Sequence, residues 1–358
     1  MVKSHWVLVV YLKNFGFFFK NVKKNSRNKK IHFFNKYPLS KEEFDNIDIQ
    51  RLSLDEICMS DEYYSEDMEK YLNIKVETDT LNDTLTKIIT EKSVKTLNNN
   101  QKLSIQTFIL SQLLRTPGNI RKKLEMIKWL KTLPKEVYDK SIQNYENYIP
   151  QENLPSTKEE YQKMFEKNIY LASKFPKLLK DFKMQIWINK TNVQFYSSDN
   201  PVIDKTNFMF WNNKIFEAKT KYSPPTPKLI LPVNPQILIL FEKVLDINPK
   251  NYPSKIIVKD FNKALKINNG IIRNAEEIVL MKSKKQNELK SAIKINLKCL
   301  EKKHYIYKVM NIKNMKPNLT RLVETKKDYA CKFCGKIYHT KEGIEKHLEK
   351  YCKIKNKS

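Results

Sequence analysis

Apolar residues in this chain follow two different periods, and the change between them divides the body of the protein. Between about residues 40 and 180 they recur every three or four positions, as Leu81 and Leu85 do. That spacing places them on one face of an amphipathic helix. A helix-start signal in the same region, Ser156 followed by Glu159, fits a capping box. The first half of the body is therefore predicted to be mainly helical.

From about residue 183 to residue 283 the period falls to two. Met184, Ile186 and Ile188 alternate with other residues, which is the pattern of a half-buried strand. We expect this strand to form a hairpin with residues 193–197 across a turn at 189–191. Further strands are predicted at 229–233, 236–241, 256–258 and 278–281.

The first 39 residues predict two more strands. Apolar stretches at 15–19 and 31–34 flank a polar run that is rich in basic residues, and the segment contains no acidic residue. Strands and helices together predict an α+β fold, with a helical first half and a mixed sheet in the second half of one large domain. Its boundaries are placed at 1–283, a Lys-rich helix and linker follow at 284–327, and a small module occupies 328–354.

Composition places the chain among globular proteins with an excess of positive charge. Of its 358 residues, 41% are hydrophobic and 30% are charged, which is enough apolar material for a large core. The 67 Lys and Arg residues against 39 Asp and Glu residues give a formal net charge of +28. Such a field attracts polyanions, so nucleic acid is the expected partner, with DNA and RNA both open. An AT-rich genome, which inflates Lys whatever the function, is the competing explanation.

Cysteine usage and the N-terminal segment both favour an intracellular protein. Five cysteines, three of them within the last 30 residues, do not form a disulfide framework. The apolar start from Trp6 to Leu12 is short and is followed by Lys13, so we expect neither a signal peptide nor a spanning helix. The expectation is a cytoplasmic or nuclear protein without a membrane partner.

The last 30 residues carry a metal-ligand spacing, C-x2-C-x12-H-x4-C. A Cys-turn-Cys knuckle and two ligands from one helix are the usual way to offer four tetrahedral ligands to a structural zinc ion. The expected cofactor is therefore one Zn²⁺. Its predicted ligands are Cys331, Cys334, His347 and Cys352.

Apolar positions around these ligands match the small core of a ββα finger. Tyr338 is the aromatic residue between knuckle and helix, Ile344 lies three residues before the histidine, and Tyr329 lies two before the first cysteine. The module resembles the Cys2His2 zinc-finger family, with a Cys-Cys-His-Cys ligand set. The resemblance implies a ββα module in which metal binding supplies much of the folding energy.

The helix positions that read bases in such fingers are poorly suited to that task here. They are Thr340, Glu342, Gly343 and Lys346, which include no Arg for guanine and no Asn or Gln for adenine. Since one finger covers only about three base pairs, we expect low sequence specificity and binding mainly through phosphates. Protein–protein docking through the finger is the alternative.

The body carries a second resemblance. It is similar to the family of domain of unknown function 4238 in the following motifs, which span about residues 5 to 280: Ser4-His5-Trp6, Tyr11-Leu12-Lys13-Asn14-Phe15, Tyr63-Tyr64, Glu77-Thr78, Gln112 to Pro117, Trp187, Ser198-Asp199-Asn200-Pro201-Val202 and Leu231-Pro232. Val7 stands where the family has a proline. The resemblance names the domain and implies no activity.

Three residues of the body are candidates for catalysis: Glu77, Arg115 and Asp199. Asp199 follows an alternating strand, where a carboxylate could hold a metal ion or act as a base; an Asp before Asn-Pro also fits a turn in which it accepts backbone N–H bonds. Gln112 and Arg115 share a helical face and could clamp a phosphate or form a buried polar pair. A nuclease-like enzyme acting on nucleic acid is thus the second alternative, and convergence of the three candidates in one cleft would favour it.

Overall fold

The chain divides into two compact units, Met1–Glu301 and Lys302–Ser358. The computed structural model describes the following residues: 4–5, 7, 9–17, 29–36, 47–60, 64–142, 149–174, 179, 181–205, 208–211, 214–217, 228–243, 252–300, 305–307, 322–324, 329–330 and 337–338. Each unit is described by itself.

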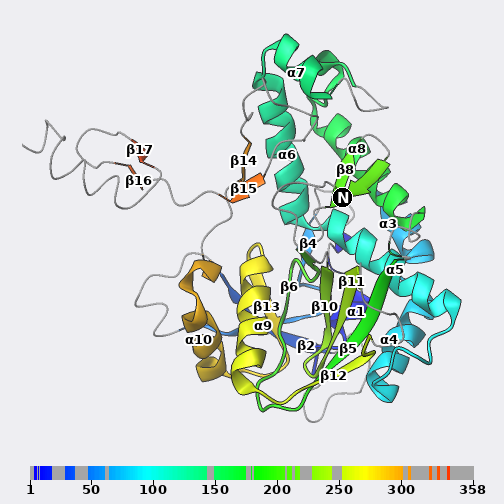
Figure 1. The fold of residues 1–358 in the computed structure, drawn as a ribbon, viewed down its shortest axis with the longest axis vertical. Helices are drawn as coiled ribbons and strands as arrows, with labels where there is room; N and C mark the ends of the chain where they lie inside the picture. Colours follow the sequence, from blue (N-terminus) through cyan, green and yellow to red (C-terminus); the bar gives the residue numbers. More distant parts are fainter. Residues whose placement is uncertain are drawn as a thin grey trace, which may run out of the picture. The chain divides into compact units, whose positions relative to one another are not determined.

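Helices dominate the first half of unit Met1–Glu301, as the apolar period predicts (Figure 1). They are α3 (Glu66–Lys75), α4 (Asp79–Glu91), α5 (Asn99–Arg115), α6 (Pro117–Thr132), α7 (Lys135–Ile142) and α8 (Lys158–Lys174), with a short 3-10 turn, η2, at Gln151–Asn153 and a four-residue helix, α1, at Val9–Leu12.

Local capping chemistry explains where several of these helices begin. The side chain of Ser65 accepts a hydrogen bond from the backbone of Met68 at the start of α3. Asn98 and Gln101 form a capping box at the start of α5. From Thr107 to Arg115 every residue of α5 is buried, because α4 and α8 both pack against this helix. α5 is therefore the central helix of the helical layer.

The larger sheet has five strands in the order β12-β5-β11-β10-β7. The strands are β12 (Lys255–Val258), β5 (Phe182–Asn189), β11 (Ile237–Lys243), β10 (Lys228–Asn234) and β7 (Ile203–Lys205). All neighbours are antiparallel except β12, which pairs in parallel with β5 and lies at the edge. Residues 237–241 of β11 are all buried, as expected for a strand whose two faces are both covered.

A second sheet joins the beginning of the chain to the end of the body. Its order is β3-β2-β13-β6, with β3 at Gln50–Ser53, β2 at Lys30–Asn35, β13 at Ile278–Met281 and β6 at Ser197–Ser198. All three pairings are antiparallel. Among the described residues of this unit, two further short pairs are β1 (Ser4–His5) with β4 (Met59–Ser60) and β8 (Phe208–Trp211) with β9 (Lys214–Glu217).

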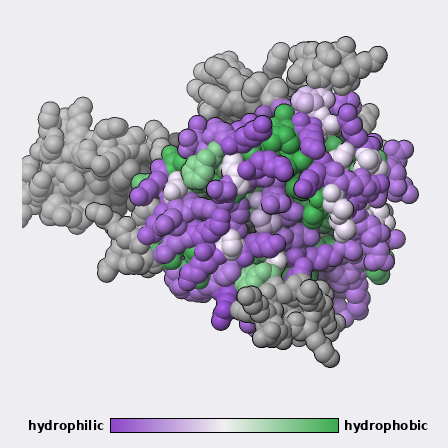
Figure 2. All heavy atoms as spheres, turned by 90° about the horizontal axis from the view of Figure 1, so that it is seen from below, coloured by the Kyte–Doolittle hydropathy of each residue, from purple (hydrophilic) through white to green (hydrophobic). Residues whose placement is uncertain are grey.

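Two helices from the end of the body, α9 (Phe261–Asn274) and α10 (Gln286–Ile295), lie side by side and are followed by the 3-10 turn η5 (Leu297–Leu300) (Figure 1). They cover one apolar cluster, which includes Leu265, Ile272 and Leu289. A larger cluster lies between the helical layer and the five-stranded sheet. The outer face seen in Figure 2 is mostly hydrophilic, with smaller hydrophobic areas.

The structure corrects two predicted strand pairings. Residues 193–197 do not form a hairpin with β5, because β11 and β12 occupy its two edges; only Ser197–Ser198 form a strand, and it pairs with β13. The predicted strand at 15–19 is reduced, among its described residues, to a single bridge between Phe17 and Lys30. Alternating sequence gives a strand's faces but does not give its partner.

The second unit contains two described strand pairs. β14 (Tyr305–Tyr307) pairs with β15 (Leu322–Glu324), and β16 (Tyr329–Ala330) pairs with β17 (Ile337–Tyr338), both antiparallel. α10 buries Leu289, Ala292 and Ile293 within the first unit, although it falls in the segment that the sequence assigns to a helix and linker. Among the residues that the structure describes, no helix is both long and apolar enough to cross a membrane.

Candidate functional site

Arg115 is the last residue of α5, and its side chain is completely buried. The helix ends there because Pro117 disfavours helical backbone at the preceding residue, and Thr116 is indeed extended. A guanidinium cannot lose its proton in a protein interior, so a buried arginine needs partners for its charge and donors. The surroundings of Arg115 supply both.

Four side chains or backbone groups converge on this guanidinium. Nη2 donates a hydrogen bond to the hydroxyl oxygen of Tyr64 at 2.7 Å and another to the backbone carbonyl of His5. Nη1 lies 3.7 Å from Oε1 of Glu77, and Nη2 lies 3.8 Å from Oε2 of Glu69. We call these five residues, His5, Tyr64, Glu69, Glu77 and Arg115, the Arg115 cluster.

The members of the Arg115 cluster come from several segments of the helical layer and its N-terminal edge. His5 lies on β1, Glu69 in the first turn of α3, and Glu77 in the connection between α3 and α4. Tyr64 directly precedes the N-cap of α3. Glu77 and Arg115 were separate candidates from the sequence, and the structure shows that they pair with each other. Glu69 was not among the sequence candidates.

Burial shifts the protonation equilibria of the Arg115 cluster. Desolvation raises the pKa of both Glu69 and Glu77, and the charge of Arg115 opposes that shift. Desolvation together with Arg115 lowers the pKa of His5, which favours the neutral imidazole. Carboxyl groups whose pKa is raised by burial beside a fixed cation are common at sites that transfer protons.

Several buried polar atoms here make no hydrogen bond to another described residue. They are Nε2 of His5, Oε2 of Glu69, Oγ of Ser111, Nε and Nη1 of Arg115 and Oγ1 of Thr116. An unmade hydrogen bond costs about 1–3 kcal/mol in a protein interior, so such a concentration is unusual away from a functional site. The arrangement combines fixed donors, acceptors and titratable groups in one place.

Asp199, the third sequence candidate, lies elsewhere and has a structural role. Its carboxylate accepts backbone N–H bonds from Glu276 at 2.9 Å, Glu277 at 2.8 Å and Ile278 at 3.0 Å. The expected convergence of the three candidates in one cleft is therefore not supported, because the described bonds of Asp199 go to residues 276–278 and Glu77 pairs with Arg115. Burial raises the pKa of Asp199 to about 6, with the three N–H bonds opposing the shift.

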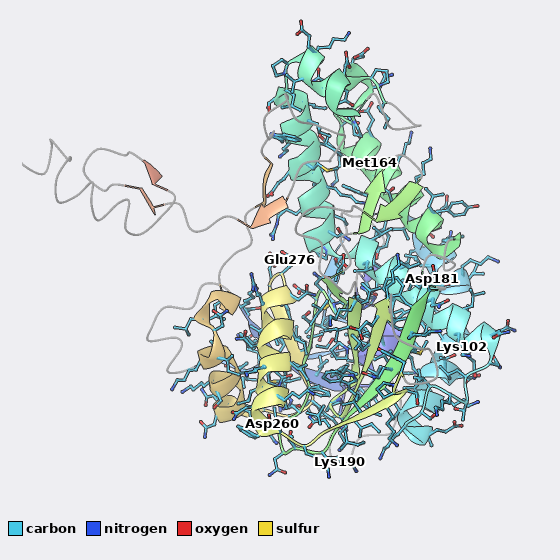
Figure 3. The ribbon with its side chains drawn as sticks, viewed as in Figure 1. Lys102, Met164, Asp181, Lys190, Asp260 and Glu276 are labelled. Atoms are coloured by element: carbon cyan, nitrogen blue, oxygen red, sulfur yellow. The ribbon has the colours of Figure 1, made fainter. Side chains whose placement is uncertain are left out.

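Glu276, whose backbone N–H binds Asp199, also contacts the start of α6 through its side chain. Its carboxylate forms an ion pair with Arg121 on α6 and lies against Gly118, in the first turn of the same helix. Thr116, the N-cap of α6, makes no side-chain cap bond. The Glu276 carboxylate therefore provides the negative charge that favours a helix N-terminus. Figure 3 labels Glu276 at the end of α9 nearest to α6.

A third polar contact ties the chain's first helix to the sheets. The hydroxyl of Tyr11 donates to the carbonyl of Pro232 at 2.7 Å and lies 2.7 Å from Oγ of Ser197. Three segments that are far apart in sequence meet at this buried hydroxyl.

A family model described as a protein of unknown function, DUF4238, matches residues 3–285. The chain belongs to this family. The match confirms the resemblance drawn from the sequence motifs and gives the DUF4238 domain nearly the whole of the first unit.

Four motif residues of the DUF4238 domain meet in the Arg115 cluster, and a fifth, Asp199, lies elsewhere. His5, Tyr64, Glu77 and Arg115 come from four of the motifs and form most of the Arg115 cluster. Asp199 comes from another motif and anchors residues 276–278. The fold thus brings four of the motifs together around Arg115 and places the Asp199 motif elsewhere.

One relative among curated proteins is a subunit of the nuclease SbcCD from Clostridium acetobutylicum. It is 26% identical over 213 residues, which are 57% of this chain and 16% of the relative. The chain therefore spans about a sixth of that protein's length. No solved structure matches the chain.

The predicted zinc ligands of the second unit lie outside the described residues: Cys331, Cys334, His347 and Cys352. What the structure describes there is the pairing of β16 with β17, in which Tyr329 faces Tyr338 and Ala330 faces Ile337. Within the described part of the chain, no group of three or more His, Cys, Asp or Glu residues could hold a metal ion.

Proposed function

We propose that this chain binds nucleic acid with little sequence preference, through a zinc finger in the second unit and basic surface on the DUF4238 domain. The observation that carries the proposal is the β16–β17 hairpin. β16 ends at Ala330 and β17 begins at Ile337, and the two strands are antiparallel. The sequence between them contains Cys331 and Cys334. Two paired antiparallel strands with two cysteines between them in the sequence match the first half of a ββα finger, which supports the proposal.

Charge supports nucleic acid as the partner. Residues 321–358 contain eleven basic and five acidic residues, a net charge of +6 out of +28 for the chain. Most of the positive charge therefore lies on the DUF4238 domain, and the finger supplies a smaller part. The name of the relative, a nuclease subunit, also supports nucleic acid as the partner.

The zinc part of the proposal is tested by metal content. Purified full-length protein should contain one zinc ion per chain, and Cys334→Ser should lose it because three ligands do not hold a structural zinc. Cys299→Ser is the matched control, a cysteine outside the ligand set, and should keep the metal. Stoichiometric zinc in the Cys334→Ser protein would refute the ligand assignment.

The nucleic-acid part is tested by salt titration. Random single-stranded and duplex oligonucleotides should bind tightly at 50 mM salt and lose about three to five decades of affinity by 200 mM, if six to ten phosphates are contacted. Deleting residues 321–358 should weaken binding and not abolish it. Affinity that is flat with salt, or absent at 50 mM, would refute the proposal and favour a protein partner for the finger.

We infer a second candidate function, processing of nucleic acid by the DUF4238 domain, from the Arg115 cluster. In this role Glu77, whose side chain is 16% exposed and whose pKa is raised by burial, donates its proton to the leaving oxygen as water attacks the phosphate, and the buried Arg115 holds Glu77 in position.

Labelled oligonucleotides incubated with the full-length protein test this activity. Glu77→Gln should remove any cleavage that the wild type shows, and Glu66→Gln, an exposed glutamate on α3, should leave it unchanged. Equal activity in both variants would exclude the Arg115 cluster from the reaction.

A further inference from the structure

A row of basic side chains runs along the outer face of α9. Lys263, Lys266 and Arg273 lie three and seven residues apart, so they share one helical face, and Lys259 directly precedes the helix. All four are exposed. From Lys263 to Arg273 the row is about 15 Å long at 1.5 Å per residue. We call these four residues the basic stripe.

Little acidic charge opposes the basic stripe. α9 itself contains no Asp or Glu, and the carboxylate of Asp260 is engaged at its N-cap with the backbone of Asn262 at 2.8 Å. No ion pair in the described part of the chain neutralises Lys259, Lys263 or Lys266. Figure 3 labels Asp260 at one end of α9 and Glu276 just beyond the other, which marks the length of the stripe.

The neighbouring segment adds to the same positive surface. Residues 255–300, from β12 to the end of η5, contain eleven basic and four acidic residues. Of the four acidic residues, Glu276 is buried and forms an ion pair with Arg121, and Glu288 forms an ion pair with Lys285 at 2.5 Å. Since α10 packs beside α9, this positive segment lies next to the basic stripe.

Aromatic side chains lie at the start of the basic stripe. Phe261, the first residue of α9, is 47% exposed, which is unusual for a phenylalanine in a folded domain. Nζ of Lys263 lies 4.4 Å from the centre of the partly buried Trp187 ring on β5, a cation–π contact that positions the lysine. Positive charge that tracks a backbone, next to an exposed ring on which a base can stack, is the pattern of single-strand binding.

We propose that the basic stripe binds the phosphates of a single-stranded nucleic acid and that Phe261 stacks on one of its bases. This inference rests on the proposed function and names the surface of the DUF4238 domain that performs it. The stripe makes no base-specific contact, which agrees with low sequence preference. A duplex, whose bases are already stacked on each other, gains nothing from Phe261.

The test compares two full-length variants with the same change in net charge. One carries Lys259→Glu, Lys263→Glu and Lys266→Glu; the control carries Lys158→Glu, Lys163→Glu and Lys167→Glu on α8, where three glutamates already interrupt the exposed lysines. The stripe variant should lose at least tenfold more single-strand affinity than the control. Its salt slope should fall by about 2, as expected for three lost phosphate contacts. Circular dichroism and thermal unfolding confirm that both variants fold.

A second pair of variants tests whether Phe261 stacks on a base. Phe261→Ala should lose about tenfold in single-strand affinity and almost nothing on duplex. Leu103→Ala, which removes an equally exposed apolar side chain from α5, should change neither. If the wild type binds with steep salt dependence and the two triple variants behave alike, the stripe is not the contact surface, and the proposed function stands without it. Equal loss on duplex and single strand in Phe261→Ala would refute the stacking.

Discussion

Nη1 of Arg115 lies 3.7 Å from Oε1 of Glu77, and this pair joins the end of α5 to the connection between α3 and α4. The arginine side chain is fully buried and the glutamate side chain is 16% exposed. A buried ion pair adds little net stability because both ions lose hydration, but removing one partner leaves the other charged and unpaired. The Arg115 cluster is therefore sensitive to single substitutions.

We predict that Arg115→Met lowers the free energy of unfolding by about 3–5 kcal/mol at pH 7.5, because two buried carboxyl groups lose their cation. The double variant with Glu77→Gln should recover part of that loss. Urea denaturation measures both. Lys70→Met is the control, since Lys70 forms an exposed ion pair with Glu66 at 3.0 Å that solvent screens, and its loss of stability should be far smaller than that of Arg115→Met. Similar losses for Arg115→Met and Lys70→Met would contradict a buried pair.

A second prediction concerns Asp199 and pH. Burial raises its pKa to about 6 from 3.8, so the native state holds this proton more tightly than the unfolded chain does. The stabilising contribution is fully present below about pH 4 and is lost as pH rises through 6. Over that range it amounts to on the order of 3 kcal/mol.

Asp199→Asn should be less stable than the wild type at every pH, because one amide oxygen cannot serve three backbone N–H donors. The gap between the two proteins should narrow as pH rises from 4.5 to 7.5, since only the wild type loses stability by ionisation at this position. Urea denaturation at four pH values measures the gap. A gap that widens with pH would mean that the three N–H bonds, and not burial, control the pKa.

The periods of helices and strands were predictable from sequence, and strand pairings were not. The helical period around Leu81 and Leu85 and the strands β10 and β11 depend on residues close in sequence. The pairing of β13 with both β2 and β6 depends on segments more than 80 residues apart, and alternation alone carries no such information.

In the candidate site, too, the sequence identified individual residues but not their contacts. The sequence identified Glu77 and Arg115 one by one, and the fold showed that they meet. Glu69 gave no signal, because its importance comes from the burial of Arg115 and not from its own neighbours in sequence. The sequence around Asp199 fitted either a catalytic carboxylate or a turn that accepts backbone N–H bonds. Its hydrogen bonds to the backbone of residues 276–278 support the second role. Tertiary contact is the missing information in each case.

A third prediction separates two helical glycines that sequence cannot distinguish. Replacing glycine by alanine inside a helix usually stabilises it by about 0.5–1 kcal/mol. Gly270, in α9, has open space at the position of a Cβ atom, with Cδ1 of Ile203 nearest at 4.0 Å. Gly118, in the first turn of α6, does not: a Cβ atom there would overlap the carboxylate of Glu276, which is 3% exposed and paired with Arg121.

Gly270→Ala should therefore raise the free energy of unfolding by about 0.5–1 kcal/mol, and Gly118→Ala should lower it by about 1–3 kcal/mol. Urea denaturation at pH 7.5 gives both values. Adding Glu276→Ala removes the overlapping carboxylate, so in that background Gly118→Ala should cost much less than it does in the wild type, a coupling that a double-mutant cycle measures. If the two glycine substitutions have the same sign, the close approach of Glu276 to α6 is wrong, and with it the assignment of Glu276 as the charge that stabilises the start of that helix.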